Sequence, residues 1–379
     1  MPITRSQAAR YTRIPLAGGG QETLLSEVGS QYLLPYFTTA DACALRLVCR
    51  EFLAAVTEQP WEDKYTMIQG SIAAWRACFP RALCAIVAQA GWVIDGGRRT
   101  PVVAADFVHL QGLRKLDVRG CTSINDAAFA YLRGIHTLDI GGCGQAGFTD
   151  AAFAHLRGIH TLRMNSCSCI TDAAFVHLVG IHTLRISDCK QAGITDAAFT
   201  HLRGIHTLNM SGCDQDGITD AAFAHLRGIH TLDMNGCDQE GITDAAFTHL
   251  RHISKLNMSG CDQEGITDAA FAHLAGIHAL DINGCNQEGI TDAAFAHLRG
   301  IHTLSMSHCY QEGITDAAFT HLGGIKELDI DGCLQDEITG ATFEHLVGVR
   351  VLTVSKARPD LKAAAQALGL YVRESEYDD

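Results

Sequence analysis

The sequence predicts an α/β solenoid in which short parallel strands alternate with short helices. One phrase of 22–24 residues recurs about eleven times between residues 105 and 354. A fixed period of this length is typical of solenoids, because one unit cannot bury its apolar face without a neighbour. The period is marked by cysteines spaced 24 residues apart except for two steps of 22: Cys121, Cys143, Cys167, Cys189, Cys213, Cys237, Cys261, Cys285, Cys309 and Cys333.

The first half of each repeat predicts a strand. In the copy that begins at Gly204, apolar residues follow the pattern L-x-x-L-x-L-x-x-C, which alternates over the strand and then ends in a buried turn. The residues at these positions are Ile205, Leu208, Met210 and Cys213.

The second half of each repeat predicts a short helix. Thr219 offers an N-cap, and Asp220 places a negative charge in the first turn. The apolar stripe of the helix consists of Ala222, Phe223 and Leu226, and a glycine at position 228 closes it. A strand and a helix therefore alternate within each period.

This combination resembles the leucine-rich repeat, specifically its cysteine-containing class. The resemblance covers residues 105–354 and is specific, because about eleven consecutive units carry the pattern. It implies a horseshoe of about eleven repeats with a curved parallel sheet and helices on the convex side. Strands in such a sheet are about 4.8 Å apart.

The repeated cysteines indicate a column of buried, unpaired thiols. A metal cluster needs thiolates that converge on one point, whereas a solenoid spaces these sulfurs along a line. Disulfides between adjacent strands are geometrically possible, but packing thiols that cap the turn are the better interpretation. Unpaired thiols fit a reducing compartment, so we expect a cytoplasmic or nuclear protein.

Histidine and aspartate form further columns. All 19 histidines lie in the repeats, mostly in one column on the helix and one before the strand. Neighbours in a column could chelate a metal, but duplication of a tolerated surface residue explains both columns. The aspartate column that includes Asp220 is expected to complement the helix dipole. We expect no metal site and no cofactor.

The sequence contains no pattern of a catalytic site. It lacks a glycine-rich phosphate loop and a nucleophile elbow, and each cluster of ionisable groups follows from repeat position. A net charge of −13 disfavours nucleic-acid binding. No apolar run approaches the ~20 residues of a membrane span. We therefore expect a binding protein rather than an enzyme.

Four other segments flank the repeats. Residues 1–22 carry three arginines and Gly18–Gly20; they are expected to form a flexible tail, with an organellar transit peptide as the alternative. Residues 23–65 predict a small helical domain, and residues 66–104 predict a helical linker or cap that includes a helix at Leu83–Val87. Residues 355–379 predict a C-terminal cap with an acidic tail.

The helical segment 23–65 resembles an F-box. Residues 45–52 read Leu-Arg-Leu-Val-Cys-Arg-Glu-Phe, and Trp61 follows nine residues later, as in the second half of that family's motif. The first half departs from the family, since Ser26 replaces a usual proline and Pro35 lies inside an expected helix. The resemblance implies that a Skp1-type adaptor contacts Leu25, Val28, Leu33, Leu34, Phe37, Leu45, Val48, Cys49, Phe52 and Trp61.

An F-box followed by leucine-rich repeats resembles the substrate receptors of cullin–RING ubiquitin ligases. The implied role is non-catalytic: the F-box docks the adaptor and, through it, a cullin, while the concave face presents a target. The alternative is a repeat scaffold whose N-terminal helices only cap the solenoid. A ribonuclease-inhibitor-like role is weaker, because the concave face lacks aromatic anchors.

The target-binding residues are expected on the concave face, at the outward positions of successive strands. Most are short polar residues, and two adjacent arginines interrupt them. Two positions near the end break the repeat, a histidine where other copies have glycine and a tyrosine where they have Asp or Asn. The expected set is Asp139, Arg163, Arg185, Asn209, Asp233, Asn257, Asp281, Ser305, His308 and Tyr310.

Overall fold

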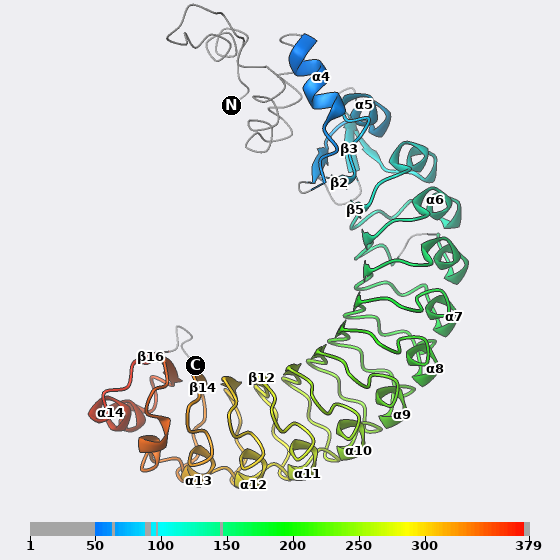
Figure 1. Ribbon diagram of the computed structural model, residues 1–379. Coiled ribbons are helices and arrows are strands. Elements are labelled where there is room, and N and C mark those ends of the chain that lie inside the picture. Colours follow the sequence, from blue (N-terminus) through cyan, green and yellow to red (C-terminus); the bar gives the residue numbers. More distant parts are fainter. Residues whose placement is uncertain (1–49, 63–64, 88–91, 96–97, 145–146, 375–379) are drawn as a thin grey trace, which may run out of the picture. The chain divides into compact units, whose positions relative to one another are not determined.

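The computed structural model describes residues 50–62, 65–87, 92–95, 98–144 and 147–374 (Figure 1). The chain divides into two compact units, residues 1–148 (unit 1) and residues 149–379 (unit 2). The parallel sheet comprises 14 of the described strands, and they follow one another in chain order. The solenoid predicted from the repeats is therefore confirmed.

Unit 1 contains helices, four parallel strands and one hairpin. Its helices are α4 (Arg50–Glu58), α5 (Ile72–Cys78), η2 (Ala104–Leu110), α6 (Asp126–Phe129) and η3 (Ala130–Leu132). Its parallel strands are β1 (Thr66–Ile68), β2 (Cys84–Val87), β5 (Lys115–Asp117) and β6 (Thr137–Asp139). The antiparallel hairpin consists of β3 (Trp92–Asp95) and β4 (Arg98–Pro101).

The expected all-helical linker over residues 66–104 is wrong in part. Residues 84–87, expected within a helix, form strand β2, which pairs in parallel with β1 and β5. A short apolar run fits a buried strand as well as a helix, and Ile86 and Val87 are β-branched residues that favour the strand. The parallel sheet thus begins at Thr66, well before the first complete repeat.

Unit 2 consists of the repeats from residue 149 onward and the C-terminal cap. In Figure 1 its strands line the inner side of an arc and its helices the outer side. Its strands are β7 (Thr161–Arg163), β8 (Thr183–Arg185), β9 (Thr207–Asn209), β10 (Thr231–Asp233), β11 (Lys255–Asn257), β12 (Ala279–Asp281), β13 (Thr303–Ser305), β14 (Glu327–Ile330), β15 (Val351–Val354) and β16 (Val372–Glu374). Its helices are η4 (Asp150–Leu156), α7 (Asp172–Phe175), α8 (Asp196–Phe199), α9 (Asp220–Phe223), α10 (Asp244–Phe247), α11 (Asp268–Phe271), α12 (Asp292–Phe295), α13 (Asp316–Phe319), η5 (Phe343–Leu346) and α14 (Pro359–Ala367).

Equivalent residues of neighbouring repeats lie directly beside one another. Leu208 pairs with Leu232, for example, and each is buried between the sheet and the helices. The predicted helix stripe is buried too, including Phe223. Helices α7–α13 are each four residues long, and the positive φ of Gly228 and most of its counterparts then turns the chain back toward the next strand.

The repeat cysteines form the expected column of buried thiols. None of the described cysteines forms a disulfide, and the Sγ of Cys261 donates to the carbonyl oxygen of Met234 in the preceding repeat at 3.0 Å. Burial raises the pKa of Cys261 to about 12. The thiols are therefore neutral donors that link one repeat to the next.

The aspartate column does more than complement the helix dipole. Asp244, the first residue of α10, accepts two hydrogen bonds from Thr267 of the next repeat, from the backbone N–H at 2.8 Å and from Oγ1 at 2.7 Å. The same pair of bonds recurs from Asp150 to Asp316. Each carboxylate therefore joins two repeats, a role that the sequence analysis missed.

The C-terminal cap forms partly as predicted. Helix α14 begins at Pro359, and Leu370 is buried, but Leu368 remains exposed. The Arg358 guanidinium donates to the carbonyl oxygens of Cys333, Gln335 and Ile338, which satisfies backbone groups of the last turn. Strand β16, which was not predicted, then adds to the edge of β15.

Candidate binding face

The outward row of strand positions in unit 2 is the expected binding face. Because side chains alternate along a strand, the buried leucine at each strand centre leaves its two neighbours facing the inner side of the arc. The described row in unit 2 consists of Arg163, Arg185, Asn209, Asp233, Asn257, Asp281, Ser305, Asp329, Thr353 and Arg373.

In the middle of this row the polar side chains bind one another. Asn209 Nδ2 donates to the Asp233 carboxylate at 2.5 Å. Ser259 Oγ lies within hydrogen-bond distance of both Asn257 Oδ1, at 2.7 Å, and Asp281 Oδ1, at 2.6 Å. Burial raises the pKa of Asp233 above its ordinary value. These groups are engaged within the molecule, so a partner would have to displace existing bonds to reach them.

Asp139 belongs to unit 1 and fits the expected binding role poorly. It is only 7% exposed, and its carboxylate accepts the backbone N–H of Gly141 at 3.0 Å. Arg119 lies 3.7 Å from the same carboxylate. Burial and these partners leave Asp139 with little surface for a target, and its expected role in binding stays a prediction.

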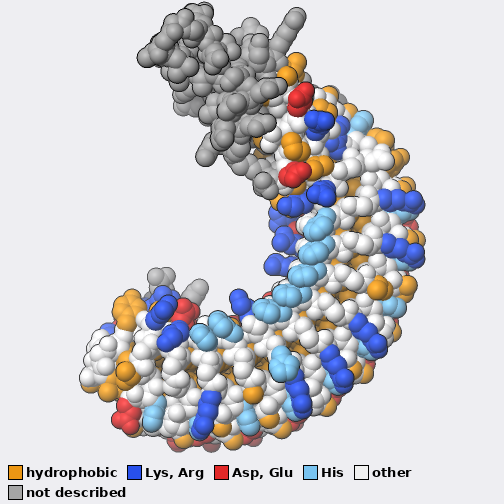
Figure 2. Space-filling view, in the orientation of Figure 1, with side chains coloured by type: hydrophobic (Ala, Val, Ile, Leu, Met, Phe, Trp, Pro, Cys, Tyr) orange, Lys and Arg blue, Asp and Glu red, His pale blue; other side chains and the backbone are white. Residues whose placement is uncertain are grey.

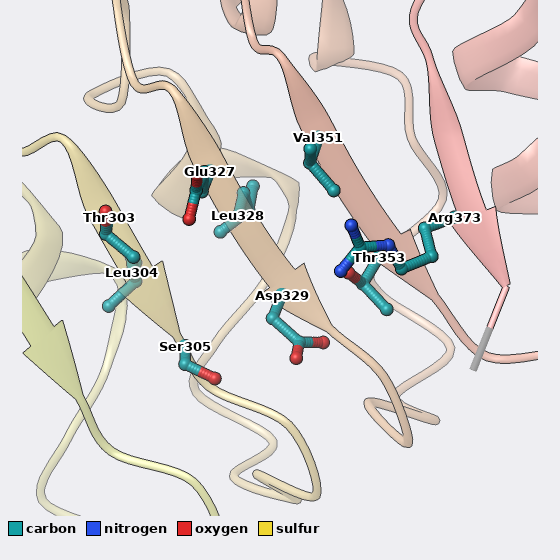
Figure 3. Close-up of a pocket in the computed structure, with 9 residues that line it drawn as sticks. All are labelled: Thr303, Leu304, Ser305, Glu327, Leu328, Asp329, Val351, Thr353 and Arg373. Atoms are coloured by element: carbon teal, nitrogen blue, oxygen red, sulfur yellow. The ribbon is translucent and has the colours of Figure 1, made fainter. Parts of the chain in front are cut away.

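The C-terminal end of the row is hollowed. Strands β13–β16 surround a hollow of about 400 Å³, and Figure 3 shows the Arg373 side chain extending over Thr353 of β15. The sheet register places Ser305, Asp329, Thr353 and Arg373 on successive strands. The lining residues are Thr303, Leu304, Ser305, Glu327, Leu328, Asp329, Val351, Thr353 and Arg373.

The hollow carries opposite charges that do not neutralise each other. Burial raises the pKa of Asp329, whose carboxylate accepts the backbone N–H of Asp331 at 3.0 Å. Arg373 and Glu327 are exposed and take part in none of the ion pairs found among the described residues. The hollow therefore offers two carboxylates and a guanidinium to a ligand.

Two residues that break the repeat lie next to this charge cluster. His308 has a φ of 54° at a position where most copies have glycine and two have Ser166 and Asp188, and its imidazole partly opposes the burial that raises the pKa of Asp329. Its Nδ1 lies 3.1 Å from the Tyr310 hydroxyl. Tyr310 and, one repeat later, Leu334 are large exposed side chains.

Most of the expected adaptor-binding residues lie outside the described residues. These are Leu25, Val28, Leu33, Leu34, Phe37, Leu45, Val48 and Cys49. Phe52 lies in α4, and its side chain is also outside the description. Trp61 is described: it is 3% exposed, donates to the Val56 carbonyl oxygen at 3.2 Å and packs edge-on against Phe79.

Sequence reasoning missed Glu327 and Arg373 as site residues. Glu327 replaces the threonine found in most copies, which is a signal that could have been noticed. Arg373 belongs to β16, beyond the last repeat, so the repeat pattern does not predict its position.

Among the described residues, no cluster of three or more His, Cys, Asp or Glu side chains could hold a metal ion. The helices of the described segments are all too short or too polar to cross a bilayer.

Stacked strand–helix units and an open inner face define a repeat solenoid of the leucine-rich-repeat class. The chain belongs to the family described as BspA type leucine rich repeat region, whose pattern matches residues 122–254 and 216–348 in six copies. This family assignment covers the repeats and does not extend to the F-box-like segment.

Solved structures support the same fold. An internalin (inlF) from Listeria monocytogenes shares 16% identity over 74% of this chain and 85% of its own, with a TM-score of 0.53. Toll in its glycosylated complex with Spatzle, from Drosophila, shares 13% identity over 81% of this chain and 51% of its own, with a TM-score of 0.55.

A TLR13–ssRNA13 complex shares 16% identity over 67% of this chain, with a TM-score of 0.51. The chain spans only 44% of that protein's length. At such identities these likenesses establish the fold alone. No curated protein matches the sequence.

Proposed function

We propose that this protein is a non-catalytic binding module and that the C-terminal end of the row in unit 2 holds a partner protein. The observation that carries the proposal is the hollow between β13 and β16. Asp329, Glu327 and Arg373 line it, and they take part in none of the ion pairs found among the described residues. A matching partner presents a basic group toward the carboxylates and a carboxylate toward Arg373.

Three further observations support a protein partner. The variable residues His308, Tyr310 and Leu334 lie at the same end of unit 2, and tyrosine is enriched at interface hot spots. The net charge of −13 disfavours a polyanion. The Toll structure with the same fold is a complex with a protein, Spatzle. The absence of disulfides among the described buried cysteines favours a reducing, intracellular compartment.

The proposal is tested by site-specific photocrosslinking in lysate of the source organism. A photoreactive phenylalanine analogue replaces Val351 in the hollow or, as the control, Val179, which is exposed and does not line the hollow. We expect one protein to crosslink from position 351 and not from position 179. The same crosslinks from both positions, or none from position 351, would overturn the proposal.

A second candidate function is adaptor docking within a cullin–RING ubiquitin ligase. It is supported by the F-box-like residues 45–52 and by Trp61, whose burial against Phe79 fits a helical element joined to the sheet. Leu25→Ala is expected to weaken capture of a Skp1-type adaptor while leaving the melting temperature nearly unchanged. If wild-type protein captures no adaptor, adaptor docking is excluded and only the function as a binding module remains.

A further inference from the structure

The repeats of unit 2 separate charge between their two edges. The segments that lead from helices α8–α12 into the next strands contain His, Arg or Lys but no Asp or Glu; they are residues 197–207, 221–231, 245–255, 269–279 and 293–303, of which 269–279 carries histidine alone. The loops that follow each strand and its cysteine contain Asp and Glu but no Arg or Lys; they are residues 213–220, 237–244, 261–268, 285–292 and 309–316. Because these segments precede and follow the same strands, they lie at the two opposite ends of the strands. We call the end with the histidines and arginines the basic edge of the repeats and the end with the carboxylates the acidic edge.

The basic edge consists of one arginine column and two histidine columns, visible in Figure 2 as blue and pale-blue rows along unit 2. Arg203 and Arg227 are exposed, and each Nε lies 3.3–3.4 Å from the Nδ1 of a histidine in the next repeat. The imidazoles of His182, His206 and His230 stack at 4.6 Å with an angle of 12° between their planes.

Stacking of this kind argues against a metal site on the basic edge. Nearly parallel rings direct their nitrogen lone pairs side by side, whereas a chelated ion needs them to converge. The Nδ1 atoms of His182, His206 and His230 each lie within 3.2 Å of the hydroxyl of the following threonine. The column is therefore a regular row of surface groups rather than a chelating cluster.

Besides the aspartate that begins each helix, the acidic edge presents one or two carboxylates per repeat. Asp238 accepts the backbone N–H of Asp262 at 3.2 Å, and Asp262 accepts that of Asn286 at 3.0 Å, so one column is fixed from repeat to repeat. A second column is exposed and forms no hydrogen bond among the described residues; it consists of Asp216, Glu240, Glu264, Glu288 and Glu312.

We propose that unit 2 self-associates edge to edge, with the basic edge of one copy against the acidic edge of a second copy. Both edges belong to the same repeats, so their charges share one period, and the 4.6 Å between imidazoles matches the strand spacing of about 4.8 Å. The arginine column, which Ala275 interrupts, can therefore pair in register with the carboxylate column of a second copy, which an unrelated acidic partner would match only by chance. The contact is head-to-tail, so each copy keeps a free edge and stacks can grow.

The test is sedimentation velocity of the full chain at about 10 mM and about 1 M salt, where the Debye lengths are about 30 Å and 3 Å. Two variants reverse the charge of one edge each, Arg227→Glu with Arg251→Glu and Glu240→Lys with Glu264→Lys. All four side chains are exposed. Matched controls make the same charge changes outside both edges, Arg81→Glu with Lys356→Glu and Glu58→Lys with Glu62→Lys.

We expect wild-type protein and both controls to associate at low salt and to dissociate at high salt. Each edge variant alone should associate at least tenfold more weakly, and an equimolar mixture of the two variants should recover association, because the reversed edges are again complementary. Thermal melts should be unchanged. Wild-type protein that stays monomeric at low salt, or a mixture that fails to recover association, would overturn the proposal. Crosslinking from position 351 to another protein does not depend on this result.

Discussion

The middle repeats of unit 2 and its C-terminal end use the same framework in different ways. From β9 to β12, each repeat keeps the same cysteine, aspartate, threonine and phenylalanine, and the polar residues of the strand row bond to one another. From β13 to β16, the framework persists, but the row opens into a hollow with unneutralised charges. The difference indicates that the columns maintain the solenoid, while departures from the repeat provide the binding surface.

The largest expected effect is the loss of a core phenylalanine in the middle of unit 2. Phe247 is fully buried between neighbouring repeats on both sides. Phe247→Ala should lower the free energy of unfolding by about 3–5 kcal/mol, measured by urea titration. Phe343→Ala, at an equally buried position near the end, should instead loosen the terminal repeats first, because a solenoid unfolds from weakened units. Identical unfolding profiles would contradict this difference.

A smaller loss is expected when one aspartate of the column is removed. Asp244→Ala breaks two hydrogen bonds to Thr267 of the next repeat and should lower the free energy of unfolding by about 1–3 kcal/mol. Glu240→Ala, in the same loop but without such bonds, should change it by less than about 0.5 kcal/mol. Equal effects in the same titrations would mean that the bonds between repeats contribute little.

His308 should separate stability from binding. Its positive φ is unfavourable for a side chain, so His308→Gly should stabilise the fold by about 1 kcal/mol while weakening partner binding. His252, with a φ of 73° at the end of its repeat's helix, is the matched control: His252→Gly should stabilise similarly without affecting the partner. Thermal melts and crosslinking from position 351 measure the two effects. Unchanged binding in His308→Gly would exclude His308 from the site.

The smallest effect concerns the pH dependence at Asp329. Burial raises its pKa in the folded state. The hydrogen bond from the Asp331 N–H and the imidazole of His308 oppose this effect, whereas the charges of Asp331 and Asp281 add to it. The folded chain therefore binds this proton more readily than the unfolded chain, and the carboxylate lowers stability at neutral pH. Asp329→Asn should be slightly more stable than wild type at neutral pH. The difference should vanish as the pH falls through the raised pKa toward the unfolded-state value of about 3.9.

The sequence predicted the features that repetition reinforces. The strand and helix of each repeat, the buried thiols and the capping threonines recur often enough for their period to identify them. The helix expected at Leu83–Val87 was wrong, because a single short apolar run has no period to decide its structure. The hollow was also beyond prediction: it depends on four strands, one of which, β16, follows the repeats and pairs through backbone groups alone.

The central claim is that the C-terminal hollow of unit 2 binds the partner, and the most direct test is the affinity of the crosslinked partner for charge variants of the full chain. Arg373→Glu reverses the guanidinium of the hollow, whereas Arg350→Glu reverses an exposed arginine that does not line it. We predict that Arg373→Glu raises the Kd at least tenfold, a loss of about 1.4 kcal/mol of binding free energy, and that Arg350→Glu changes the Kd less than twofold. Equal affinities of wild type and Arg373→Glu would contradict the claim.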